Sequence, residues 1–102
     1  MSQLTVTDLT RVRRHPERAH YDRDTLHALL DAALICHIAF VLDGQVQQIP
    51  TACWREGEHL YIHGSNGSRM IRALRAGASV CVAVSLFDGL VLAKSSFSTS
   101  VN

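Results

Sequence analysis

Apolar residues recur at helical spacing in the first third of this chain. The positions that carry the pattern are Leu26, Leu29, Leu30 and Ala33. They lie three or four residues apart in most steps, which places them on one face of an α-helix. We therefore predict an amphipathic helix over residues 25–34, with Asp24 as its N-cap and its apolar side against a sheet.

A second short helix is predicted over residues 68–76. Its inward positions are Met70, Ile71 and Leu74. Gly77 follows them, at the place where a glycine in the left-handed conformation commonly ends a helix.

From Ile35 onward the pattern changes to apolar runs of strand length. The predicted strands span residues 35–42, 45–54, 58–63, 79–87 and 90–98. The turn dipeptides between them are Asp43-Gly44 and Asp88-Gly89, both typical of type I′ hairpins, and the weaker signal Glu56-Gly57. Tight turns join antiparallel strands, and a run that is apolar on both faces must be covered or closed into a barrel. The pattern predicts a mainly β fold, a small antiparallel barrel with short peripheral helices.

Composition limits the size of this fold. The chain has 102 residues, of which 47% are hydrophobic and 19% charged, enough for one domain with a single core. We interpret residues 1–102 as that domain, with an irregular arm over residues 1–23 and the barrel with its two helices over residues 24–102. The arm is rich in arginine around Pro16. A solvated leader is favoured there over a segment that binds a partner or covers a cofactor.

Charge and cysteine content exclude several classes of protein. The formal net charge of +1 gives no support to a broad basic surface for nucleic acid. No apolar run reaches the roughly 18 residues of a membrane span. Cys36, Cys53 and Cys81 form an odd set without a C-x-x-C pair, and no signal peptide precedes them. We interpret them as core residues of a reduced, cytoplasmic protein.

The segment HGSNGSRM joins the third predicted strand to the second predicted helix. Ser65 and Ser68 offer hydroxyl donors, Arg69 offers a guanidinium, and the helix N-terminus presents unpaired N–H groups. These donors together predict a phosphate-binding site. The alternative is an ordinary N-cap at Ser68 with Arg69 in solvent. Arg72 and Arg75 are expected to be solvated.

The same segment, with IPT upstream, resembles the flavin-nucleotide-binding relatives of pyridoxamine 5′-phosphate oxidase. The likeness continues through RRHPERAHYDRDTLHALLDAALICHIAF before it and VCVAVSLFDGLVLAKSSF after it, over most of residues 11–98. The resemblance implies an antiparallel split β-barrel homodimer that binds FMN in a cleft between its subunits.

The resemblance also implies roles for particular residues. The FMN phosphate is held by Ser68 and Arg69. Backbone groups along the isoalloxazine ring come from Pro50, Thr51 and Ala52. The ribityl chain and the ring are lined by His63, Gly64 and Ser65. Met70, also at the cofactor, replaces a lysine of the oxidases, which removes a phosphate contact and weakens the expectation of pyridoxal-forming activity.

Pro50 carries information of its own, because proline cannot donate a hydrogen bond to a β-ladder. The strand around it is expected to be an edge or to carry a bulge. An edge leaves the N–H and C=O groups of Thr51 and Ala52 free for the hydrogen-bonding rim of a flavin. The alternative is that Pro50 marks an edge and nothing more.

The histidines allow several interpretations. His59 and His63 share one face of the third predicted strand, but a metal site there needs a third ligand from elsewhere, and no metal is expected. His63 is favoured as a flavin or substrate contact, and His37 as a buried polar group with its hydrogen bonds satisfied. No Ser-His-Asp or paired-carboxylate arrangement supports hydrolysis, and no catalytic residue is assigned.

The C-terminal end departs from the family. The sequence stops at SFSTSVN, where family members continue through further strands. The barrel is therefore expected to lack its closing strands and to pair its edges with another chain. At residues 98–100, STS replaces a histidine-containing run, which removes a proton-transfer candidate.

Three functions are compatible with these features. The first is an FMN-dependent oxidoreductase that passes electrons from a reduced nicotinamide cofactor, NAD(P)H, to a small-molecule acceptor. The second is a module that binds or stores flavin, or haem, without turnover. The third is a small barrel that contacts another protein or a nucleic acid through its arginine-rich arm.

Overall fold

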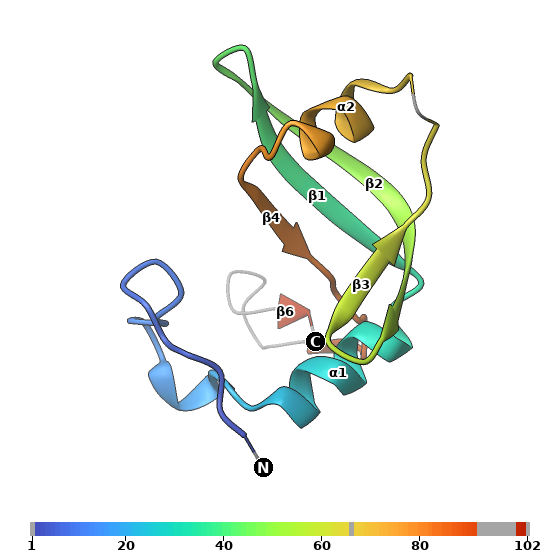
Figure 1. Ribbon diagram of the computed structural model, residues 1–102. Coiled ribbons are helices and arrows are strands. Elements are labelled where there is room, and N and C mark those ends of the chain that lie inside the picture. Colours follow the sequence, from blue (N-terminus) through green and yellow to red (C-terminus); the bar gives the residue numbers. More distant parts are fainter. Residues whose placement is uncertain (1, 66, 92–99, 102) are drawn as a thin grey trace.

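The computed structural model describes residues 2–65, 67–91 and 100–101 (Figure 1). Four antiparallel strands form the main sheet in the order β3-β2-β1-β4, namely β1 (Ile35–Leu42), β2 (Gln45–Glu56), β3 (His59–Ile62) and β4 (Val80–Ala83). A separate two-stranded sheet pairs β5 (Leu90–Val91) with β6 (Ser100–Val101). The helical elements are the 3-10 turn η1 (Pro16–Arg18) and the helices α1 (Arg23–Ala32) and α2 (Arg69–Arg75). None of the helices in this part of the chain is long and apolar enough to cross a membrane.

The hydrophobic core lies between the main sheet and α2. Alternate residues of a strand point to the same face, and Cys36, Ile38 and Phe40 of β1 are buried on the face that α2 covers. Met70 and Ala73, three positions apart on α2, close this layer. Figure 1 shows α2 beside the upper half of the sheet. The second predicted helix and its inward-facing side are confirmed.

α1 begins two residues earlier than its pattern predicted. The N-cap is Asp22 rather than Asp24, because the Asp22 carboxylate accepts hydrogen bonds from the backbone N–H (2.9 Å) and the hydroxyl (2.7 Å) of Thr25. These hydrogen bonds lower the pKa of Asp22. Asp24 lies in the first turn instead, where its charge interacts favourably with the helix dipole.

The apolar side of α1 is covered only in part. Ala33 is buried just past the helix, but Leu26 and Leu29 remain 37% and 41% exposed, so the prediction that this side lies against the sheet is wrong for these two residues. An ion pair also connects the helix to β2. Arg55 of β2 donates hydrogen bonds of 2.8 and 2.7 Å to the two carboxylate oxygens of Asp31, and this pairing lowers the pKa of Asp31.

The first predicted hairpin is confirmed. Asp43 and Gly44 both have positive φ angles, 50° and 75°, as a type I′ turn requires. β1 and β2 then pair without a break, residues 35–42 against residues 45–52. Gly57, with φ 60°, lies in the turn that joins β2 to β3.

The hairpin predicted at Asp88-Gly89 is wrong. Neither residue has a positive φ, and the strand before them, β4, already ends at Ala83. β4 pairs with β1, and β5 pairs with β6. Residues 37–40 of β1 pair with β4 on the side away from β2, and residues 84–89, between β4 and β5, form no strand or helix. Residues 92–98 of the last predicted strand lie outside the described residues.

α2 ends at the glycine that its sequence predicted. Gly77 has φ 84°, and its N–H donates to the carbonyl oxygen of Leu74 at 3.0 Å. The N–H of Ala78 donates to the carbonyl oxygen of Ala73 at 3.1 Å. This pair of hydrogen bonds is a Schellman motif, which satisfies carbonyl groups that the helix end leaves unpaired.

Residues 2–22 lead into α1 with little regular structure. They fold back on Tyr21, whose carbonyl oxygen accepts a hydrogen bond from the N–H of Leu4 (2.6 Å) and whose hydroxyl accepts one from the N–H of Val12 (2.8 Å). The exposed arginines of this segment are Arg11, Arg13, Arg14 and Arg18.

Candidate cofactor-binding site

β2 has an open side along the segment that contains Pro50. The strand pairs with β1 over residues 45–52, but with β3 only over residues 53–56. Within the described ranges, no other strand pairs with residues 45–52. The edge that the proline predicted is therefore present, although β2 as a whole lies inside the sheet. Thr51 and Ala52, which follow Pro50, belong to the part of β2 that has a partner strand on one side only.

The loop after β3 lies next to this open side. β3 ends at Ile62, so His63 follows the strand rather than closing it as predicted. The hydroxyl of Thr51 donates to the carbonyl oxygen of His63 at 3.4 Å, which ties β2 to the start of the loop. Two of the segments that the sequence singled out, residues 50–52 and 63–65, are thus neighbours.

Gly64 is the point where the loop comes closest to α2. A Cβ atom at this position would lie 2.8 Å from Cγ1 and 2.9 Å from Cδ1 of Ile71. Such distances are well inside the contact distance of two carbon atoms. Only a glycine allows the loop to approach the helix this closely, so Gly64 fixes the position of the loop against α2.

Ser68 caps α2 in the ordinary way. Its hydroxyl oxygen accepts the N–H of Ile71 at 3.1 Å, and its own N–H donates to the carbonyl oxygen of Ser65 at 3.1 Å. The alternative stated for Ser68, an N-cap, is therefore what the structure shows, and the hydroxyl hydrogen is still available to donate. For the N–H groups of Arg69 and Met70, the described residues supply no acceptor.

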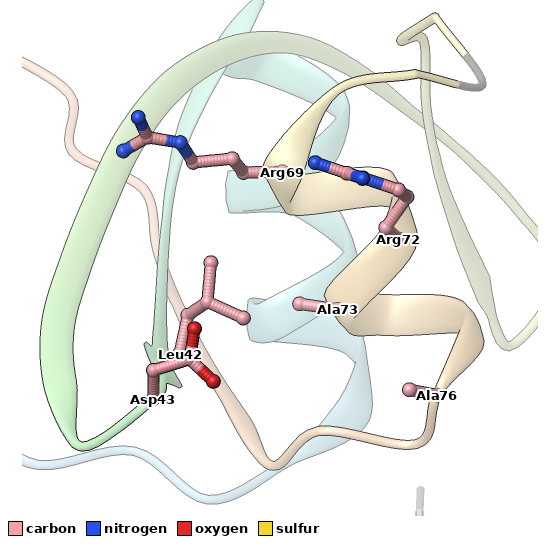
Figure 2. A pocket seen from close by; sticks show the side chains of 6 residues that line it. All are labelled: Leu42, Asp43, Arg69, Arg72, Ala73 and Ala76. Carbon is pink, nitrogen blue, oxygen red and sulfur yellow. The ribbon is translucent and has the colours of Figure 1, made fainter.

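Arg69 and Arg72 line a common cavity of about 390 Å³ between α2 and the β1–β2 turn. Figure 2 shows the two guanidinium groups toward one end of the cavity and Asp43 at the other. The sequence reading placed Arg72 in solvent, and it is indeed exposed, but it shares this cavity with Arg69. Residues three apart on a helix lie on the same face, and this spacing is the sequence signal that Arg69 and Arg72 could line one cavity.

The side chain of Met70 is buried in the core, with 5% of its surface exposed. It packs there with residues of β1, so its backbone N–H is the part that remains for a bound group. The buried side chain of Met70 therefore cannot replace the charged phosphate contact expected of a lysine at this position.

His37 does not lie where the sequence suggested. It was expected to be buried and hydrogen-bonded, but its side chain is exposed on the sheet face opposite α2. Neither ring nitrogen has a hydrogen-bond partner in residues 2–65, 67–91 or 100–101. The expectation failed because the buried residues of β1 are its even-numbered positions, and His37 lies between two of them.

The cysteines separate into two kinds. Cys36 and Cys53 are buried in the core as predicted, whereas Cys81 is exposed, contrary to prediction. Burial, and after it the neighbouring Cys53 thiol, raise the pKa of Cys36 to about 11. Cys36 is therefore a neutral core thiol rather than a nucleophile. No three His, Cys, Asp or Glu side chains among the described residues form a metal-binding group.

The chain is similar to solved structures over most of its length. The sequence model of the family described as pyridoxamine 5′-phosphate oxidase matches residues 22–102. The flavocytochrome Anf3 from Azotobacter vinelandii is 40% identical, with a TM-score of 0.85 over 94% of this chain and 44% of that chain. The FAD and haem binding protein from Mycobacterium smegmatis is 42% identical, with a TM-score of 0.74 over 78% of this chain and 39% of that chain. No curated protein sequence matches the chain.

These likenesses confirm the predicted fold class. The protein is a mainly antiparallel half-barrel of the split-barrel type with two short helices. It spans less than half the length of either solved structure.

Proposed function

Because the chain belongs to the pyridoxamine 5′-phosphate oxidase family, we propose that it binds a flavin nucleotide, FMN, and uses it in electron transfer. In this proposal a reduced nicotinamide cofactor, NAD(P)H, supplies the electrons, and a small molecule accepts them. The supporting observation is that the loop after β3 contacts two segments far from it in sequence: its His63 carbonyl oxygen accepts a hydrogen bond from Thr51 of β2, and its Gly64 lies against Ile71 of α2.

The chemistry of these segments fits a flavin nucleotide. The rim of the isoalloxazine ring is a row of hydrogen-bond donors and acceptors, and the open side of residues 50–52 offers backbone groups of both kinds. The phosphate is doubly negative, and the start of α2 offers it the N–H groups of Arg69 and Met70 with the guanidinium of Arg69. His63, Gly64 and Ser65 join these two ends.

The protein's contribution is to bind and orient the cofactor. When bound, the flavin supplies the hydride and single-electron chemistry. Arg69 holds the phosphate by charge, Thr51 fixes the loop to β2, and Gly64 keeps the loop against α2. No side chain is assigned to move a proton.

A second copy of the chain is the proposed partner. On the sheet face opposite α2, apolar and aromatic side chains are exposed, with Val41 at 56%, Val46 at 79% and Trp54 at 46%. Trp54 stacks on Tyr61 there, with ring centroids 5.6 Å apart. Burial of such a face against an identical one is favourable, and it supports a homodimer with the flavin between its subunits. The free thiols support a reducing, cytoplasmic setting.

Haem is a second proposed ligand, either beside the flavin or in a module that binds without turnover. The observation that favours it is that both solved structures are described as haem proteins, one as a flavocytochrome and the other as an FAD and haem binding protein. The second description also makes FAD an alternative to FMN. The arginine-rich arm, as a contact for another macromolecule, is the remaining alternative.

The absorbance spectrum of the purified, intact chain, recorded together with its mass, tests the proposal. A flavin gives a yellow protein with bands in the near-ultraviolet and blue, and anaerobic NAD(P)H bleaches them if the flavin accepts hydride. Recovery of the bands with an added oxidant, over many turnovers, supports an enzyme. Bleaching without turnover supports a binding module. A colourless protein that takes up neither FMN nor FAD contradicts the proposal.

A further inference from the structure

His37 has no hydrogen-bond partner among the residues that the structure describes, and it occupies an unusual position for such a histidine. It lies in the middle of β1, with Pro50 of β2 and Ala83 of β4 directly opposite it in the two flanking strands. Neither neighbour has a polar side-chain atom, so the imidazole is flanked by apolar groups on both sides. An imidazole with both nitrogens unused is available to coordinate a metal ion.

The same histidine lines a hollow of about 540 Å³ on the sheet face opposite α2. The hollow is bounded by the end of α1, the start of β1 and the segment after β4. Apart from Ser85, its walls are apolar, and they include Leu34, Ile35, Pro50 and Leu86. Leu34 and Ile35 are 77% and 55% exposed. The volume is within the range of small-molecule and cofactor sites, which are apolar hollows with few polar groups.

We propose that His37 would ligate the iron of a haem held in this hollow. The proposal rests on the haem-binding part of the proposed function and names the residue that would carry it. A protein holds haem through a side-chain ligand to its iron, often a histidine, and through apolar surroundings. Here His37 supplies the imidazole, and the exposed Leu34 and Ile35 are part of an apolar wall next to it.

None of the other five histidines lines the hollow. His15 and His27 lie 3.3 and 3.4 Å from the carboxylates of Glu17 and Glu58. The ring of His59 lies 6.3 Å from that of Tyr61, outside the hollow. His63 is exposed at the segment assigned to the flavin, so it is the principal competitor of His37.

The test is a titration of the purified full-length chain with haemin, followed by the Soret band. We expect a saturable site in the wild type and at least tenfold weaker binding in His37→Ala. Because His37 is exposed, this variant is expected to keep its fold, which its circular dichroism and its flavin affinity check. Added imidazole is expected to restore the Soret position of the ligated iron in His37→Ala, which a merely structural role would not produce.

The control variants are His59→Ala, on the same sheet face but outside the hollow, and His63→Ala. Both are expected to bind haemin as the wild type does. Loss of the Soret shift in His63→Ala with retention in His37→Ala overturns the proposal. A wild type that binds flavin but no haemin also overturns the haem proposal, and the proposed flavin function then still stands. Haemin binding through His37 in a protein that binds no flavin supports the haem proposal and contradicts the flavin function.

Discussion

Replacement of Gly64 by alanine tests whether the loop after β3 is held against α2 by close packing. In the wild type, an added Cβ would lie 2.8 Å from Cγ1 of Ile71. Carbon contacts become favourable at about 3.5 Å, so Ile71 or the loop has to move by roughly 0.7 Å. Ile71 is β-branched and helical, so its χ1 angle is nearly fixed and rotation offers little relief.

Overpacking of this kind costs about 1–3 kcal/mol. The loss of backbone freedom in the unfolded chain offsets roughly 0.4–1 kcal/mol of that cost when glycine becomes alanine. We therefore expect Gly64→Ala to lower the free energy of unfolding by about 1–2 kcal/mol, which is roughly 4–16 °C in Tm for a domain of this size. Urea denaturation followed by circular dichroism measures the change.

A double-mutant cycle isolates the cause. In an Ile71→Ala background both close atoms are gone, and Gly64→Ala is expected to cost less than about 0.5 kcal/mol. Gly67→Ala is the matched control, since nothing lies within 4 Å of its added Cβ and its φ is not positive. If Gly64→Ala costs the same with and without Ile71, or if Gly67→Ala costs as much, the close approach is not what holds the loop.

Two further predictions concern the ends of the helices. Gly77→Ala is expected to lower the free energy of unfolding by about 1 kcal/mol, because φ 84° is unfavourable for a residue with a Cβ; an unchanged urea midpoint would show that the Schellman motif is not needed. Asp22→Ala is expected to lower the urea midpoint at pH 7, because the N-cap of α1 is lost. Hydrogen bonds from Thr25 lower the pKa of Asp22 in the folded state, so its stabilising contribution is present above the ordinary aspartate pKa of 3.8 and is lost as the pH falls through the lower pKa of the folded state. The difference between wild type and Asp22→Ala should therefore shrink in acid, and a constant difference would count against the carboxylate as the cap.

Local patterns in the sequence predicted the elements whose determinants are themselves local. The Asp43-Gly44 turn, the Gly77 helix end and the inward side of α2 each depend on a few consecutive residues, and all three are observed. The family resemblance rested on a continuous segment around Arg69, and the family match includes it.

Features that depend on distant partners were predicted less well. Asp88-Gly89 is a good turn dipeptide, but β4 ends at Ala83 on its partner β1, and the dipeptide lies outside the strand that it was expected to close. His37 alternates with buried residues, and periodicity alone does not say which face of β1 is covered.

The candidate site shows the same division. Residues 50–52 and 63–65 were singled out separately, and the contact between Thr51 and His63 that joins them emerges only from the fold. The cavity shared by Arg69 and Arg72 depends on where the β1–β2 turn lies, which the helix sequence does not contain.

The central claim is that the start of α2 holds the phosphate of a flavin nucleotide, and comparison of FMN with riboflavin tests it most directly. Riboflavin has the same ring and ribityl chain but no phosphate. Fluorescence titration of the wild type should give at least tenfold tighter binding of FMN, because a charge-assisted hydrogen bond contributes about 1.5–3 kcal/mol. In Arg69→Ala this preference should largely disappear, with riboflavin affinity little changed. Equal affinities for FMN and riboflavin in the wild type, or an undiminished preference in Arg69→Ala, would contradict the account.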